Sequence, residues 1–144
     1  MFEKILVAFD GTDAGRQAFM VGLAIAKRFG GEIYVCSVIE HLVRQSFVLK
    51  GAVEDIIDHA TKHFEFTRRP LLQRAEREGV KVTSHLMVGG AVEKLLQFAE
   101  KEHINVIVIG GIGEPHFLRW DSRSTGMQIA SRAPCSVIVA RELT

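Results

Sequence analysis

Five short apolar runs lie along the chain, and four of them are nearly continuous in hydrophobic residues. Such runs are typical of parallel β-strands covered on both faces. These four runs lie at Lys4 to Phe9, Ile33 to Ile39, Ile104 to Ile109 and Cys135 to Ala140. The fifth run, Val80 to Val88, alternates roughly between apolar and polar residues. It is therefore predicted to be a less buried strand at an edge of the sheet.

Helical periodicity fills the stretches between these runs. A first helix is predicted from a cap at Thr12 or Asp13 to about Arg28, where Gly30 and Gly31 end it. Two further helices are predicted in the C-terminal half, at Val92 to Ala99 and at Ser124 to Arg132.

The longest helical pattern contains a proline. Apolar residues recur with helical spacing from Val53 to Phe64, and the pattern continues beyond Pro70 until Gly79. Proline kinks a helix interior, but it is favoured at the first helical position. The pattern therefore indicates either one kinked helix or a second helix that begins at Pro70.

Alternation of strands and helices predicts the fold class. Strand–helix–strand units cross over with a right hand and place their strands in parallel. The chain is therefore predicted to be a three-layer α/β protein, with helices on both faces of a parallel sheet. Its 144 residues fit a single domain, residues 1–144.

The net charge, the cysteines and the apolar stretches indicate which partners and which cellular location to expect. Eighteen Lys and Arg against seventeen Asp and Glu give a net charge of +1, which offers no electrostatic basis for binding nucleic acid or an anionic membrane surface. Cys36 and Cys135 lie in apolar runs and are predicted to be reduced thiols. The longest apolar stretch, Ala18 to Ala26, is about half of what a bilayer span needs, and the N-terminus shows no targeting segment. A cytoplasmic protein is therefore expected.

Candidate binding residues follow the first and the fourth predicted strands. Asp10 ends the first, where a carboxylate can accept hydrogen bonds from a ribose or from a base amino group. Gly110, Gly111 and Gly113 follow the fourth, and glycines let backbone N–H groups approach phosphate oxygens. Both features also have a structural explanation, because carboxylates cap helices and glycines suit any tight strand-to-helix turn.

These residues resemble the universal stress protein family. The resemblance is carried by Ile5 to Asp13, Ile107 to Gly113 and Ala133 to Val139, and it spans nearly the whole chain in element order and length. It implies an adenine nucleotide alpha hydrolase-like fold, with five parallel strands in the order 3-2-1-4-5, and commonly a homodimer. The family divides into members that bind ATP and members that do not.

The ATP-binding members carry the motif G-x2-G-x9-G-[ST] after the fourth strand. In this chain Gly110 and Gly113 match the first pair, residues 114–122 fill the spacer, and Ser124 matches the hydroxyl position. Arg123 replaces the third glycine. Its long side chain would occupy the phosphate volume, turn outward, or donate a bidentate hydrogen bond to the phosphates.

Carried over residue by residue, the resemblance implies an ATP site, with or without Mg²⁺. Asp10 would lie near the adenosine part with Ala8 beside it, and Val38 would contact adenine. The ribose and phosphates would be lined by Gly110, Gly113, Arg123, Ser124 and Thr125.

Two functional hypotheses follow, and both include a homodimer through the apolar strand Cys135 to Ala140, which is expected at a sheet edge. The first is an adenine-nucleotide-binding stress-response or signalling protein. It is not expected to be an enzyme beyond slow ATP hydrolysis, because the sequence has no P-loop lysine and no nucleophile elbow. The second is a dimeric interaction module without nucleotide, in which Arg123 and the bulky segment Phe117 to Trp120 fill the pocket. A hydrolase or transferase acting on a small nucleotide is a third, weaker hypothesis.

Two other clusters are interpreted as structural. His59 and His63 have the spacing of a metal-chelating pair, but their phase places them near a solvated flank and no third ligand is evident, so no metal site is predicted. His116 is interpreted as a surface imidazole. The basic stretch Arg68 to Arg77 is interleaved with glutamates and is predicted to be a solvated helix face, not a nucleic-acid footprint.

Overall fold

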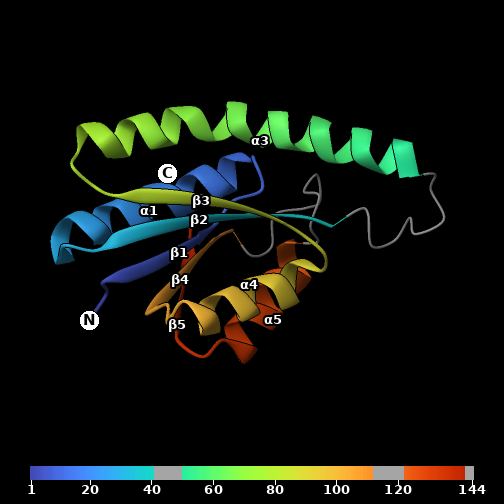
Figure 1. The fold of residues 1–144 in the computed structure, drawn as a ribbon. Coiled ribbons are helices and arrows are strands. Elements are labelled where there is room, and N and C mark those ends of the chain that lie inside the picture. The colour runs from blue at the N-terminus through green and yellow to red at the C-terminus, as the bar shows by residue number, and fades with distance from the viewer. Residues whose placement is uncertain (41–49, 112–121, 142–144) are drawn as a thin grey trace.

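Five parallel strands form the central sheet, in the order β3-β2-β1-β4-β5. The computed structural model describes residues 1–40, 50–111 and 122–141, without the side chains of residues 50–52 and 122–124 (Figure 1). The strands are β1 (Lys4–Ala8), β2 (Glu32–Ile39), β3 (Val82–Val88), β4 (Val106–Gly110) and β5 (Ser136–Ala140). This order confirms the predicted topology and places β1 and β4 side by side near the centre of the sheet.

Helices cover both faces of the sheet, as predicted. In the described part of the chain they are α1 (Asp13–Phe29), α3 (Lys50–Arg77), α4 (Ala91–Lys101) and α5 (Ser122–Arg132). Figure 1 shows α1 and α3 on one face and α4 and α5 on the other. Ile5 and Val7 of β1 belong to the core beneath α1 and α3, whereas Leu6 and Ala8 belong to the core beneath α4 and α5. Because both faces are covered, β1 needs apolar residues at successive positions.

The ends of α1 follow the sequence signals. Thr12 is the N-cap, and its side chain accepts a hydrogen bond from the backbone N–H of Gly15 at 3.2 Å. Gly30 ends the helix with a φ of 67°, in the left-handed region that a side chain would strain.

The α3 helix runs through Pro70 without a break for 28 residues, which confirms the single-helix alternative. Phe64 and Leu71 face the sheet and are buried. Arg68 lies between them on the same face and is only 8% exposed. The interpretation of Arg68 to Arg77 as a solvated face is therefore wrong at Arg68, because helical spacing places this residue in the buried row.

No described helix is both long enough and apolar enough to span a bilayer.

The two edges of the sheet are β3 and β5, as predicted for both. On β3, Thr83 and Ser84 are exposed, and Val88 is 41% exposed. On β5, Ser136 is exposed and the three residues after it are half-buried. Both edge strands are thus less covered than β1 and β4, because each lacks a neighbour on one side.

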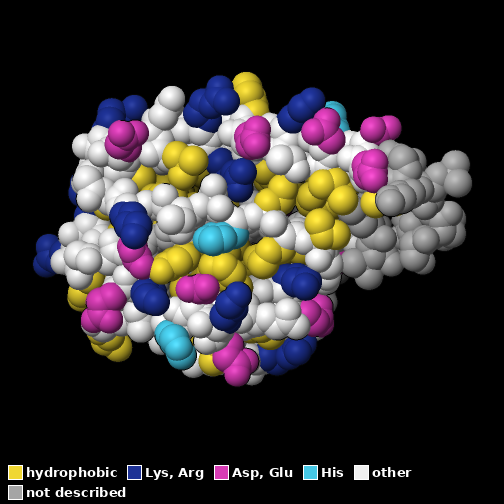
Figure 2. Space-filling view, in the orientation of Figure 1, with side chains coloured by type: hydrophobic (Ala, Val, Ile, Leu, Met, Phe, Trp, Pro, Cys, Tyr) yellow, Lys and Arg dark blue, Asp and Glu magenta, His cyan; other side chains and the backbone are white. Residues whose placement is uncertain are grey.

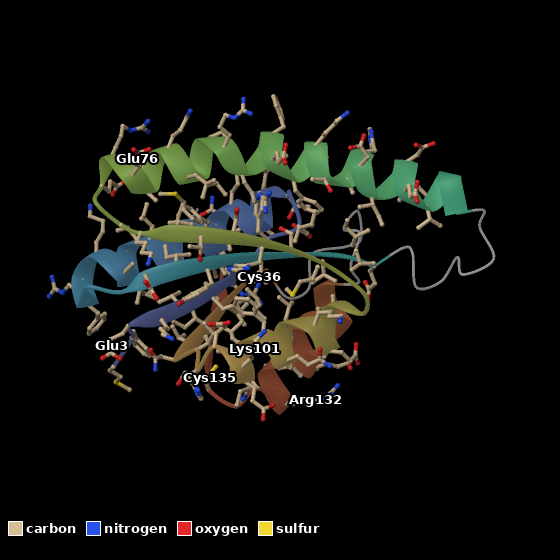
Figure 3. All side chains as sticks on the ribbon, viewed as in Figure 1. Glu3, Cys36, Glu76, Lys101, Arg132 and Cys135 are labelled. Carbon is tan, nitrogen blue, oxygen red and sulfur yellow. The ribbon has the colours of Figure 1, made fainter. Side chains whose placement is uncertain are left out.

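Both cysteines are free thiols, as predicted. Cys36 lies in β2 with no exposed surface, and burial raises the pKa of its thiol. Cys135 lies just before β5 and is half-buried, and burial raises the pKa of its thiol as well. Figure 3 shows Cys36 between the helix layers and Cys135 near the start of β5. Neither thiol is in an environment that favours a reactive thiolate.

Candidate functional site

A small cavity lies where the carboxyl ends of β1 and β4 meet. The chain leaves these adjacent strands toward opposite faces of the sheet, since α1 follows β1 and α5 follows β4. This is the position at which open α/β sheets bind ligands. The described lining comprises Ala8, Asp10, Thr12, Ala14, Gly15, Ile109, Gly110, Thr125, Gly126 and Ile129. The cavity volume is about 30 Å³, which has room for about two water molecules.

Asp10 follows β1 directly and is only 7% exposed. Its Oδ1 atom accepts a hydrogen bond from the backbone N–H of Thr12 at 3.0 Å and another from the Thr12 hydroxyl. Asp10 therefore supports the turn that leads into the cap of α1, in line with the structural explanation. The second oxygen, Oδ2, has no hydrogen-bond donor among the described residues, so half of this carboxylate remains available to a ligand.

Gly110 is a glycine for a packing reason. A Cβ atom there would lie 2.3 Å from the carbonyl oxygen of Ala14 and 2.5 Å from its carbonyl carbon. Gly15 is similarly constrained, because its Cβ would lie 2.8 Å from the ring of Phe9. These close approaches bring the first turn of α1 against the ends of β1 and β4. The first turn of α1 therefore contributes one wall of the cavity.

The opposite wall comes from α5. Thr125 is 8% exposed, and Ile129 lies one helical turn later on the same face with no exposed surface. Gly126 completes this part of the lining. The Thr125 hydroxyl has no hydrogen-bond partner among the described residues. The cavity thus combines an apolar floor with two polar groups that the described part of the protein leaves unused.

Four of the eight predicted site residues line this cavity together: Ala8, Asp10, Gly110 and Thr125. Val38 is 2% exposed, belongs to the core beneath α4 and α5, and is not part of the described lining. Arg123 and Ser124 belong to the first turn of α5. Outside the described residues lie Gly113, His116, Phe117 to Trp120 and the side chains of Arg123 and Ser124.

Sequence reasoning missed several lining residues: Thr12, Ala14, Gly15, Ile109, Gly126 and Ile129. Two of them could have been found. Thr12 has the pattern of a helix cap, and a cap that follows the first strand lies beside Asp10. Ile129 follows Thr125 by one helical turn, and that spacing predicts a shared face.

His63 reaches the turn after β1 from α3. Its Nε2 atom lies 3.1 Å from the position that a Cβ on Gly11 would occupy, and Gly11 has a φ of +88°. His63 is half-buried, whereas His59 is exposed. These exposures agree with the predicted flank position of the pair, with His63 on the side of the flank nearer the sheet. Within the described residues, no three His, Cys, Asp or Glu side chains gather as a metal-ligand group.

Comparison with known proteins shows one family. The model of the Universal stress protein family matches residues 1–141. A universal stress protein of Methanocaldococcus jannaschii is 25% identical over 142 residues, a match that covers 99% of this chain and 84% of that protein.

Solved structures share the fold over nearly the whole chain. The universal stress protein UspA of Lactobacillus plantarum has a TM-score of 0.81 at 22% identity, with 97% of this chain and 98% of that chain covered. A universal stress protein in complex with cAMP has a TM-score of 0.70 at 17% identity, covering 97% of each chain. An Arabidopsis thaliana family member with AMP bound has a TM-score of 0.73 at 12% identity, covering 99% and 93%.

Proposed function

The chain belongs to the universal stress protein family, and from that premise we propose that it binds an adenine nucleotide at the cavity between the ends of β1 and β4. In this proposal the chain is a stress-response or signalling protein, and binding of the nucleotide changes how the chain acts on a partner protein. It acts as a dimer. One observation carries the proposal. Asp10 and Thr125 both line a cavity at the point where the chain leaves β1 and β4 toward opposite faces. Neither Asp10 Oδ2 nor the Thr125 hydroxyl has a hydrogen-bond partner among the described residues.

The chemistry of the lining supports this ligand class. A carboxylate oxygen can accept hydrogen bonds from a ribose hydroxyl or an adenine amino group. The start of α5 offers backbone N–H groups and the positive end of a helix dipole, which favour a phosphate. Two structural neighbours, described with cAMP and with AMP bound, support an adenine nucleotide in particular. The proposed ligands include ATP, with or without Mg²⁺, beside AMP and cAMP.

The size of the cavity sets how the nucleotide would bind. A volume of about 30 Å³ is too small to enclose an adenylate. We therefore place the bulk of the ligand at the mouth of the cavity, with a hydroxyl or amino group reaching Asp10. The rival function, a dimeric module without nucleotide, is favoured by this small volume and by the packing reason for Gly110.

AMP, cAMP and Mg²⁺–ATP are each tested as ligands by differential scanning fluorimetry. At least one should raise the melting temperature of the wild-type chain progressively with concentration, because a ligand that binds only the folded state stabilises it. Asp10→Asn should weaken that ligand about tenfold, since an N–H₂ donor replaces the free Oδ2 acceptor while Oδ1 still closes the turn at Thr12.

Asp13→Asn is the matched control. The Asp13 side chain is 89% exposed, pairs with Arg16 and lies outside the described lining. This variant should keep the wild-type response. If no nucleotide shifts the wild-type melting temperature up to millimolar concentration, the nucleotide proposal fails and the interaction module takes its place.

We propose the exposed edge of β5 as the dimer interface. Ser136 is exposed on this edge strand, so Ser136→Lys would add a charge to the paired strands of two copies and weaken the dimer. Light scattering over a micromolar concentration range should show a dimer for the wild type and more monomer for this variant. Thr83→Lys, an exposed position on the opposite edge strand, is the control and should leave the dimer intact. A monomeric wild type would refute the interface.

A further inference from the structure

Arg68 is a nearly buried cation on the inner face of α3. Phe64 lies four residues before it and Leu71 three residues after it, so the three side chains share one face of the helix. Phe64 is 1% exposed, Leu71 is 6% exposed and Arg68 is 8% exposed. An arginine with so little exposed surface is uncommon unless an anion is paired with it.

No described carboxylate forms an ion pair with Arg68. Its Nε atom donates a hydrogen bond to the Phe64 carbonyl oxygen at 3.1 Å, but its terminal nitrogens have no acceptor among the described residues. Burial lowers the pKa of the Arg68 guanidinium, and the charge of the nearby Glu65 raises it again in part. A guanidinium remains protonated in such a setting. In the described part of the chain His85 Nε2 is the buried side-chain nitrogen or oxygen that lacks a hydrogen-bond partner, so the terminal nitrogens of Arg68 are not fully enclosed. These terminal nitrogens can therefore be reached from the surface and remain available to an anion.

Ser84 of β3 lies on the same side of the sheet as Arg68. Phe64 packs in a cluster with Leu86, and Leu71 belongs to the cluster against which Val82 packs. Arg68 lies between Phe64 and Leu71 on α3, and Ser84 lies between Leu86 and Val82 on the face of β3 that α3 covers. Ser84 is exposed. The exposure of Ser84 shows that α3 does not cover β3 completely at this position.

The same stretch of β3 has an unpaired main chain. Ile33 N donates to Lys81 O at 2.9 Å, and Gly89 N donates to Ile39 O at 3.1 Å. Since these groups alternate in direction along a strand, the odd-numbered residues of β3 point their N–H and C=O groups at β2. Val82, Ser84 and Leu86 point theirs to the free edge, where no described segment pairs with them.

Apolar surface flanks this free edge. Val88 is 41% exposed, and Val82 and Leu86 are half-buried. Figure 2 views this face: hydrophobic side chains gather on both sides of β3, and a Lys or Arg side chain lies among them. Unpaired main-chain groups and apolar side chains therefore lie on β3, on the side of the sheet where α3 carries Arg68.

We propose that the free edge of β3 binds an extended acidic segment of a partner protein, which adds as a sixth strand and places a carboxylate on Arg68. Strand addition would satisfy the outward main-chain groups of Val82, Ser84 and Leu86. A planar guanidinium with two free nitrogens matches a carboxylate in a bidentate geometry. The main-chain edge favours a peptide over a small anion, and the cation favours an acidic one. This surface is separate from the nucleotide site, so neither proposal depends on the other.

The probe is a heptapeptide of alternating threonine and valine with a central aspartate, compared with its asparagine counterpart. Amide NMR shifts of the labelled full chain report binding and its location. The aspartate peptide should shift the amides of Val82, Ser84 and Leu86 and should bind about tenfold more tightly than the asparagine peptide. Arg68→Gln should remove this preference, and Arg68→Lys should reduce it. Arg69→Gln, at an exposed neighbouring position, should keep it.

Ser84→Pro tests the strand addition itself. The N–H of Ser84 faces the free edge, so proline there removes no hydrogen bond to β2 but blocks a sixth strand. Ser84→Pro should abolish peptide binding, and Ser84→Ala should preserve it. Equal affinity of the two peptides for the wild type would overturn the role of Arg68. Three results would overturn the peptide site as a whole: no amide shift at millimolar peptide, the same shifts with inorganic phosphate alone, or self-association lost in Ser84→Pro, which would assign the edge to a second copy.

Discussion

Gly110→Ala is expected to lower the free energy of unfolding by about 3 kcal/mol. The new Cβ would lie 2.3 Å from the Ala14 carbonyl oxygen, 2.5 Å from its carbonyl carbon and 2.9 Å from its Cβ. Two of these three are backbone atoms in the first turn of α1, which cannot rotate away as a flexible side chain could. Relief therefore requires α1 to move away from β4, with loss of the buried contacts that Phe19 and Leu23 make in the core. Urea denaturation followed by circular dichroism measures the change.

Gly30→Ala provides the contrast. Gly30 has a φ of +67° and no heavy atom within 4 Å of its Cβ position, so alanine there adds backbone strain but no clash. Its cost should be about 1 kcal/mol. If Gly110→Ala costs no more than Gly30→Ala, then α1 is not held against β4 as described. The requirement for glycine at position 110 would then come from a bound ligand and not from packing.

Hydrophobic patterning predicted the sheet because every covered strand needs apolar residues on both faces. Ile5, Leu6 and Val7 alternate between two different cores, and the resulting continuous run distinguishes a central parallel strand from an edge. The alternating run at Val80 to Val88 identified β3 as an edge for the converse reason. Local caps at Thr12 and Gly30 were equally predictable, because their partners lie within a few residues.

Contacts between distant parts of the chain were not predictable in the same way. The sequence offered a binding role and a tight-turn role for Gly110, whereas its packing against Ala14, in another element, is visible only in the structure. Val38 was placed at a ligand by resemblance, but its side chain points into the core beneath α4 and α5. Its role at the nucleotide remains a prediction.

The error at Arg68 has a different origin. The charge of Arg68 predicts an exposed side chain, whereas its helical spacing from Phe64 and Leu71 predicts a position on the buried face. The structure agrees with the spacing. The aliphatic part of an arginine side chain can pack on the buried face of a helix while its guanidinium lies at the edge of that face, near solvent. The sequence itself contains this conflict between the charge of Arg68 and its position in the helical repeat. The proposed partner surface includes this residue.

Pro70→Ala is expected to raise the free energy of unfolding by about 3 kcal/mol, because proline in a helix interior is less favourable than alanine by this amount. α3 continues through Pro70, so the carbonyl of Phe66 has no N–H partner four residues later. Pro70 is exposed and Phe66 is 75% exposed, so alanine should lose little packing. Urea denaturation provides the measurement.

Arg69→Ala is the matched control, an exposed substitution one residue away, and should stay within about 0.5 kcal/mol of the wild type. A loss of stability in Pro70→Ala would instead indicate a helix that begins at Pro70, where proline is favourable. That result would also separate Phe64 and Arg68 from Leu71, since the first two would then lie on a different helix. The placement of Arg68 and Leu71 on one inner face depends on one continuous α3, so the stability of a single exposed variant bears directly on the proposed partner surface.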